Sequence, residues 1–111
     1  MQYHELNVRE PYFTLIKNGT KTIEGRLYDG KFKDFNIGDK IKFINGDNFC
    51  ICEIVGLRTY KNFHELLKRE TLKKTLPGVR YSLQGVAIYN NFYKEKLDKG
   101  IKALAIELKI Q

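Results

Sequence analysis

The spacing of apolar residues changes several times along the chain, and each change predicts a new structural element. Residues 2–8 alternate weakly between apolar and polar side chains, which predicts a short first strand. Pro11 then begins a segment with apolar residues at helical spacing, and Asn18 and Gly19 are residue types that end helices. The pattern therefore predicts one short amphipathic helix over residues 11–18.

From Lys21 onward the period becomes two, which is typical of a strand with one buried face. Ile23 and Leu27 fall on one face of this strand, whereas Glu24 and Arg26 fall together on the other. Lys21 has the parity of the buried residues, so it can join the charged pair only from the turn that precedes the strand. A surface ion pair between Glu24 and Arg26, with Lys21 solvated, is the simpler interpretation of this spacing.

Strands joined by turns are predicted in the middle of the chain. Residues 29–39 are rich in Asp, Gly, Lys and Asn and predict a loop, which leads into a strand over residues 40–44. The Asn-Gly-Asp sequence at residues 45–47 predicts a tight hairpin, followed by a strand over residues 49–57. The apolar stretch in that strand predicts burial on both faces or a barrel wall. Strands that follow one another through short turns predict an antiparallel, partly closed sheet.

The second half of the chain predicts two helices and a closing strand. Asn62 is a capping residue in front of an apolar stripe, and Ser82 begins a second helix with a broad contact face. The predicted members of that face are Leu83, Val86, Ala87, Tyr89 and Tyr93. Residues 101–110 alternate and predict a strand with one strongly buried face.

The composition fits one domain. A chain of 111 residues, of which 42% are hydrophobic, buries roughly two thirds of the surface that it exposes when unfolded. No apolar run approaches the roughly 20 residues that cross a bilayer, and the N-terminus lacks the features of a signal peptide, so we expect a cytoplasmic protein with no membrane partner. Cys50 and Cys52 are too close in the strand for an unstrained disulfide, which predicts reduced packing thiols. His4 and His64 complete no zinc spacing with them, so we expect no metal and no other cofactor.

The net charge of +7 is unevenly distributed. Residues 1–60 contain nine basic and eight acidic side chains, whereas residues 61–111 contain eleven and five. A basic surface attracts polyanions, which makes nucleic acid the leading partner class, although an ordinary solubilising surface explains the charge equally well. Lys73 and Lys74 belong to this basic half.

One aromatic and basic run lies in the predicted second helix of this half. Its members are Tyr89, Phe92, Tyr93, Lys94 and Lys96. Such a mixture suits single-stranded nucleic acid, because bases stack on rings while phosphates contact lysines. Core packing accounts for most of these rings as well, since a small barrel needs large side chains to fill it.

Gly19, Lys21, Glu24 and Arg26 together resemble the Gly-x-Lys-x-x-Glu-x-Arg signature of the ASCH domain family, part of the PUA-like superfamily. The order of predicted elements is similar to that of the family over nearly the whole chain. The resemblance implies an α+β fold: a small PUA-like mixed or antiparallel β-barrel of five or six strands, with about three short helices at its mouth. It also implies one domain over residues 1–111 and a polar cleft lined by the signature residues.

The resemblance implies a function as well, because ASCH proteins are generally inferred to bind RNA. We therefore expect a domain that binds RNA, another nucleic acid or a nucleotide, in which Glu24 accepts hydrogen bonds from an exocyclic amino group while Lys21 and Arg26 hold phosphate or a carbonyl. The candidate binding residues are Tyr12, Gly19, Lys21, Glu24, Arg26, Lys73, Lys74 and Tyr93.

Two alternatives stay open. One bacterial subgroup of similar size hydrolyses the acetyl amide of N4-acetylcytidine with a lysine base and a threonine nucleophile three residues later. Lys21 matches that lysine, but Glu24 stands at the threonine position. An amidohydrolase would then use Lys21 as the general base that activates water, and Glu24 to orient that water or to protonate the leaving amine. A protein-binding adaptor whose polar site has lost its role is the other alternative.

Overall fold

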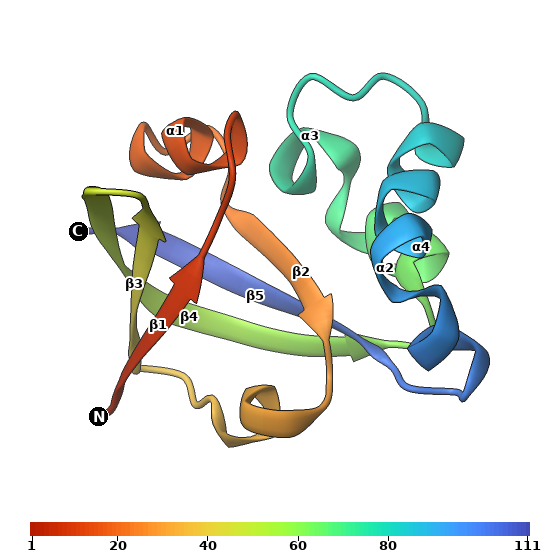
Figure 1. The fold of residues 1–111 in the computed structure, drawn as a ribbon, viewed down its shortest axis with the longest axis horizontal. Coiled ribbons are helices and arrows are strands. Elements are labelled where there is room, and N and C mark those ends of the chain that lie inside the picture. Colours follow the sequence, from red (N-terminus) through yellow and green to blue (C-terminus); the bar gives the residue numbers. More distant parts are fainter.

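Five strands form one mixed sheet in the computed structural model, which describes residues 1–111. The strands are β1 (Tyr3–Asn7), β2 (Ile23–Leu27), β3 (Lys40–Asn45), β4 (Asn48–Tyr60) and β5 (Ala103–Ile110), in the spatial order β1-β3-β4-β5-β2. β1 runs parallel to β3, and all other neighbours are antiparallel. The sheet curls into a half-barrel (Figure 1). Because β1 and β2 are both edge strands and do not pair, the half-barrel stays open along the seam between them.

Four α-helices and one 3-10 helix complete the fold. They are α1 (Tyr12–Lys17), η1 (Gly30–Asp34), α2 (Phe63–Glu70), α3 (Leu72–Thr75) and α4 (Ser82–Asp98). α2, α3 and α4 lie together on one side of the sheet, whereas α1 lies next to β1 (Figure 1). This arrangement confirms the predicted α+β fold, with five strands where five or six were expected and four α-helices where about three were expected. α4 is longer than the short helices that were expected, and the segment 29–39 that was predicted as a loop contains η1.

The sheet separates two hydrophobic cores. The first fills the inside of the curl, where Leu104 and Ile106 of β5 pack with α1 and the inner residues of the other strands. The second lies between the outer face of β2 and β5 and the helices, where Ala103 and Ala105 pack against α2 and α4. The predicted strongly buried face of the closing strand is confirmed by Leu104, Ile106 and Leu108, and the helices bury the other face at Ala103 and Ala105 as well.

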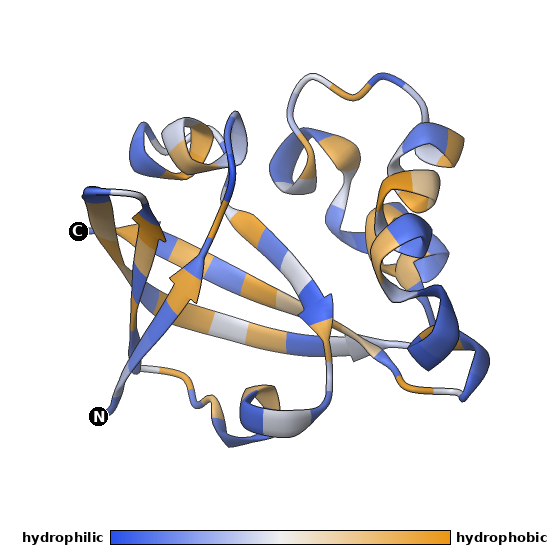
Figure 2. Ribbon diagram, viewed as in Figure 1, coloured by the Kyte–Doolittle hydropathy of each residue, from blue (hydrophilic) through white to orange (hydrophobic).

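β4 is buried on one face only, although its apolar stretch also suggested burial on both faces. Its inner residues Cys50, Cys52 and Ile54 are buried, whereas Phe49 and Val55 are exposed on the outer face. Burial on both faces is therefore wrong, and the alternative of a barrel wall holds. Figure 2 shows the alternation of apolar and polar residues along the strands. The prediction of free packing thiols is confirmed, because both cysteines are unpaired and buried.

The contact face of α4 is rotated from the predicted one. Leu83 is 80% exposed and Ala87 is also exposed, so these two predictions are wrong. Gly85 instead forms the closest contact, since a Cβ on this residue would lie 2.9 Å from the side chains of Leu67 and Leu72. The absence of a side chain at this position lets α4 approach α2 and α3. No helix of the protein has the length and apolar character to cross a membrane.

Candidate functional site

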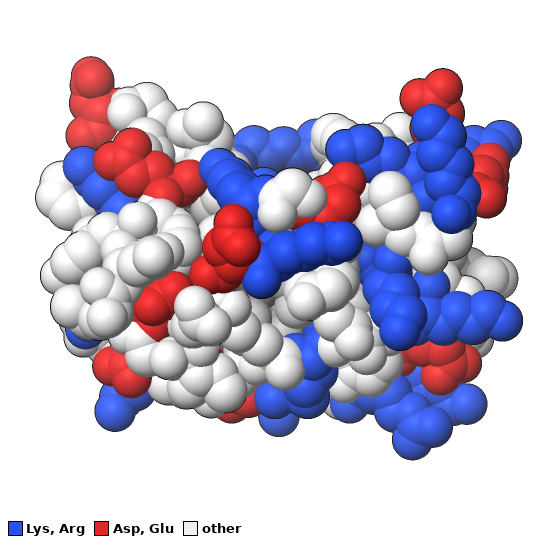
Figure 3. All heavy atoms as spheres, turned by 90° about the horizontal axis from the view of Figure 1, so that it is seen from below, with Lys and Arg blue, Asp and Glu red and all other residues white.

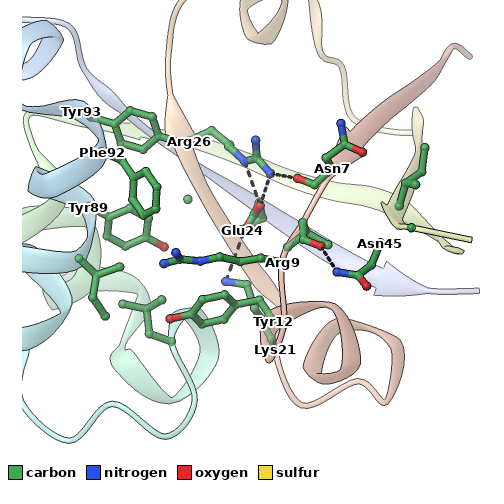
Figure 4. Close-up of a pocket in the computed structure, with 16 residues that line it drawn as sticks. Asn7, Arg9, Tyr12, Lys21, Glu24, Arg26, Asn45, Tyr89, Phe92 and Tyr93 are labelled. Atoms are coloured by element: carbon green, nitrogen blue, oxygen red, sulfur yellow. Dashed lines mark hydrogen bonds and ion pairs between the residues drawn. The ribbon is translucent and has the colours of Figure 1, made fainter. Parts of the chain in front are cut away.

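A pocket of about 500 Å³ lies beside the open seam of the half-barrel (Figure 4). Its lining comes from the end of β1 and the start of α1, from β2, from the β3–β4 turn and from α4. The lining residues are Asn7, Val8, Arg9, Tyr12, Lys21, Glu24, Gly25, Arg26, Ile44, Asn45, Gly46, Leu76, Ile88, Tyr89, Phe92 and Tyr93. The pocket therefore contains all three charged residues of the signature.

Glu24 lies between two cations at the base of this pocket. One of its oxygens, Oε2, accepts a hydrogen bond from Arg26 Nε at 2.9 Å and lies 2.8 Å from Arg26 Nη2. The other oxygen, Oε1, lies 3.4 Å from Lys21 Nζ. Lys21 is 2% exposed and Glu24 is 6% exposed. The predicted geometry is confirmed, and the interpretation as a surface ion pair with a solvated lysine is wrong.

The turn after α1 brings Lys21 to this position. Gly19 adopts a positive φ of 82°, which glycine tolerates and most residues do not. The backbone N–H of Gly19 bonds to the carbonyl of Ile16 at 3.1 Å, and that of Lys21 bonds to the carbonyl of Leu15 at 2.9 Å. Lys21 thus precedes β2 and can point at Glu24, although in a regular strand it would lie on the opposite face with Ile23.

The register of β2 with β5 directs the other two charged side chains. Glu24 pairs with Ile106, and Arg26 pairs with Leu104, both of which belong to the core inside the curl. Paired residues of antiparallel strands share a face, so Glu24 and Arg26 also face inward, beside the seam. Arg26 Nη2 donates to the carbonyl of Asn7 in β1 at 3.1 Å. This hydrogen bond connects the two edge strands, which do not pair with each other.

Two hydrogen bonds and one ion pair hold the ammonium group of Lys21 within the protein. It donates to the carbonyl of Ile23 at 2.6 Å and to the carbonyl of Thr75 at the end of α3, and it pairs with Glu24. A lysine has three N–H donors and no acceptor; backbone carbonyls take two of them, and Oε1 of Glu24 lies 3.4 Å from the nitrogen. Lys21 therefore ties β2 to α3 and holds Glu24 in place.

The pKa values follow from burial and from this charge arrangement. Burial lowers the pKa of Lys21 from its ordinary value, although Glu24 opposes the change. Burial would raise the pKa of Glu24, but the charges of Lys21 and Arg26 outweigh it and hold that pKa below its ordinary value. Glu24 is therefore ionised at neutral pH and acts only as a hydrogen-bond acceptor.

Arg9 brings a third cation to the pocket. Its guanidinium group forms no ion pair or hydrogen bond in the chain and lies 4.7 Å from the ring centroid of Phe92, which is 60% exposed. Figure 4 shows Arg9 extending across the pocket towards Tyr89 and Phe92. Tyr89 is fixed by stacking on Phe63, with ring centroids 4.1 Å apart. Arg9 was not among the predicted site residues, and only its place shortly before the first helix could have suggested it.

The structure brings some of the other candidate residues together and separates others. Tyr12 and Tyr93 line the pocket. Gly19 instead lines a smaller cavity of about 220 Å³ near the end of β5. Lys73 and Lys74 are exposed on α3 and lie outside the pocket lining. No group of three or more His, Cys, Asp or Glu side chains is placed to hold a metal ion.

The excess of basic residues is visible on the surface of the fold. Seen from below, lysines and arginines are most crowded on the side of α2 and α4, whereas the opposite side shows acidic and uncharged side chains with fewer basic ones (Figure 3). Only some of these cations have an acidic partner, such as Lys96, which pairs with Asp29 at 3.0 Å.

Comparison with known proteins agrees with this architecture. The profile of the ASCH domain matches residues 6–111. The chain is similar to the crystal structure of the hypothetical protein PH0355, with 38% identity, a TM-score of 0.89 and full coverage of both chains. It is also similar to the solution structure of PF0455 from Pyrococcus furiosus, with 35% identity, a TM-score of 0.80 and coverage of 99% of this chain and 97% of that one.

A more distant structure shares the fold alone. The ASCH domain from Lactobacillus crispatus has 16% identity and a TM-score of 0.70, over 98% of this chain and 79% of that one. Among curated proteins, none matches the chain. The family profile covers almost the whole sequence, and the chain therefore belongs to the ASCH domain family.

Proposed function

We propose that the pocket binds one nucleotide unit of RNA. The observation that supports this function is the combination of an exposed aromatic ring, Phe92, an unpaired guanidinium, Arg9, and a buried anion, Glu24, in one pocket. The pocket volume of about 500 Å³ lies within the range of ligand sites. ASCH proteins are generally inferred to bind RNA, which agrees with this chemistry.

Each of these groups has a distinct role in the proposal. A base stacks on the Phe92 ring, as bases do on aromatic side chains of single-strand binding proteins. The carboxylate of Glu24 accepts a hydrogen bond from an amino or ring N–H group of that base. Arg9 contacts phosphate, and Nη1 of Arg26, which has no partner in the chain, donates to a base carbonyl.

This assignment differs from the expectation for Lys21. The sequence suggested that Lys21 contacts phosphate or a carbonyl of the ligand. Its ammonium group is held by the carbonyls of Ile23 and Thr75 and by the charge of Glu24, so in this proposal it supports the site without contacting the ligand. Arg9 replaces it as the cation that meets the ligand.

Binding of nucleoside monophosphates, followed by calorimetry or NMR, tests the proposal. We expect the Phe92→Ala variant to bind at least about fivefold more weakly than the wild type, because base stacking contributes about 1 kcal/mol or more. The matched control is Leu83→Ala, which also removes an exposed apolar side chain from α4 but lies outside the pocket. Equal binding by the wild type and by Phe92→Ala, or no binding by any of them, refutes the proposed site.

Hydrolysis of an acylated nucleoside is a second candidate, favoured by the lowered pKa of the buried Lys21. A general base needs a free lone pair directed at water, whereas the ammonium group of Lys21 donates to two carbonyls and pairs with Glu24. The test is incubation with N4-acetylcytidine and detection of cytidine and acetate. Release of cytidine and acetate by the wild type that is lost in the Glu24→Gln variant supports the hydrolase. If the wild type releases neither product, nucleotide binding is the one remaining candidate function.

A further inference from the structure

The basic residues of α3 and of the α3–α4 connection lie next to the pocket but do not enter it. Leu76 lines the pocket and directly follows α3, so the exposed Lys73 and Lys74 lie within one turn of the pocket wall. The backbone carbonyl of Lys74 accepts a hydrogen bond from Thr22 at 3.1 Å, which fixes this part of α3 to the start of β2. These lysines are therefore held at a defined place beside the site.

The chemistry of this region favours a polyanion. No Asp or Glu occurs between Glu70 and Glu95. Lys73, Lys74 and Arg80 are exposed and form no ion pair with any acidic side chain. Three cations within eight positions of the chain, none of them in an ion pair, create a positive potential that phosphate groups can neutralise.

An exposed aromatic residue completes the region. Tyr81 directly precedes α4 and is 65% exposed. It caps α4 with an extended backbone and lies eleven residues before Phe92, a separation of about 16 Å along the helix axis. Ile88, which lines the pocket, lies between them in the sequence, one helical turn before Phe92. Leu83 precedes Phe92 by nine residues and therefore points to nearly the opposite side.

We propose that Lys73, Lys74, Arg80 and Tyr81, here named the α3–α4 rim, bind the nucleotides that flank the one in the pocket. This inference rests on the proposed binding of one nucleotide unit in the pocket. The lysines and Arg80 contact backbone phosphates of a single RNA strand, and a flanking base stacks on Tyr81. A pocket that binds one unit and a rim that binds its neighbours together select a single strand over a free mononucleotide.

The test compares a nucleoside monophosphate with a fluorescently labelled single-stranded RNA decamer. Tyr81→Ala should weaken decamer binding at least about fivefold and leave mononucleotide binding unchanged. The matched control is Leu83→Ala, two residues away and on the other side of α4, which should change neither affinity.

The charge of the rim has its own readout. The double variant Lys73→Ala/Lys74→Ala should reduce the slope of log affinity against log salt concentration by about 1.4 for the decamer, because each contact with a single strand contributes about 0.7. The control Lys17→Ala/Lys109→Ala removes the same charge from exposed positions on α1 and β5 and should change the slope by less than half as much.

The two proposals fail in different ways. The rim is refuted if the decamer binds no more tightly than the monophosphate, or if both rim variants behave like their controls. The pocket is refuted if monophosphate binding is absent or insensitive to Phe92→Ala. If the rim variants bind the decamer more weakly but Phe92→Ala does not, the result supports RNA binding at the rim and refutes RNA binding in the pocket.

Discussion

Replacement of Lys21 by methionine tests most directly whether the ammonium group of Lys21 stabilises the site. Lys21→Met preserves much of the length and apolar stem of the side chain but removes the ammonium group. The carboxylate of Glu24, which is 6% exposed, then keeps Arg26 as its one charged partner. The carbonyls of Ile23 and Thr75 both lose a donor in a buried setting.

The expected cost follows from these contacts. Removing one partner of a buried ion pair costs about 3–5 kcal/mol. Each buried carbonyl that loses its donor costs about 1–3 kcal/mol, whereas the flexible methionine recovers part of the packing. We therefore expect a loss of at least about 3 kcal/mol in the free energy of unfolding. For a domain of this size such a loss lowers the melting temperature by about 12 °C.

Urea unfolding followed by circular dichroism measures this loss. Lys17→Met is the matched control, because Lys17 lies exposed at the end of α1 and its replacement should change stability by no more than about 0.5 kcal/mol. A Lys21→Met variant as stable as this control would refute the conclusion that the ammonium group ties β2 to α3 and to Glu24.

Three further outcomes are expected from unfolding measurements. The neighbouring cations hold the pKa of Glu24 below its ordinary value of 4.5. The stability advantage of the wild type over Glu24→Gln should therefore be complete above about pH 4.5 and vanish as the pH falls through the folded-state pKa. A stability difference that stays constant down to about pH 2 would contradict this. Gly25→Ala should cost about 1–3 kcal/mol, since its Cβ would lie 2.7 Å from the Tyr89 hydroxyl, and adding Tyr89→Phe should restore part of the loss; an unchanged midpoint in urea would show that α4 moves freely. Thr75→Val should stabilise the protein by about 1 kcal/mol in calorimetry, because the buried Thr75 hydroxyl has no hydrogen-bond partner in the chain; a loss of stability would show that the hydroxyl is satisfied.

The charged signature was predictable because its geometry is local. Period-two spacing places Glu24 and Arg26 on one face of β2 whatever the rest of the fold, and the turn at Gly19 lets Lys21 join them. The burial of this cluster could not be inferred from spacing. It depends on the carbonyl of Thr75, which lies 54 positions from Lys21 in the sequence.

The features that the sequence analysis missed depend on packing between distant segments. The second buried face of β5 exists because α2 and α4 cover Ala103 and Ala105, and the alternation of residues in a strand carries no sign of such a cover. The contact face of α4 is set by the close approach at Gly85 to α2 and α3. Arg9 approaches Phe92 only because the segment after β1 and α4 line the same pocket.

An NMR titration of the labelled protein with a short single-stranded RNA tests the central claim most directly. The proposed site predicts that the largest shifts in amide resonances occur at Arg9, Gly25 and Gly46, which line the pocket. Amides on the uncovered outer face of the sheet, such as those of Phe49 and Val55, should stay unchanged. Shifts confined to that outer face, with the pocket amides unaffected at saturating RNA, would contradict the account.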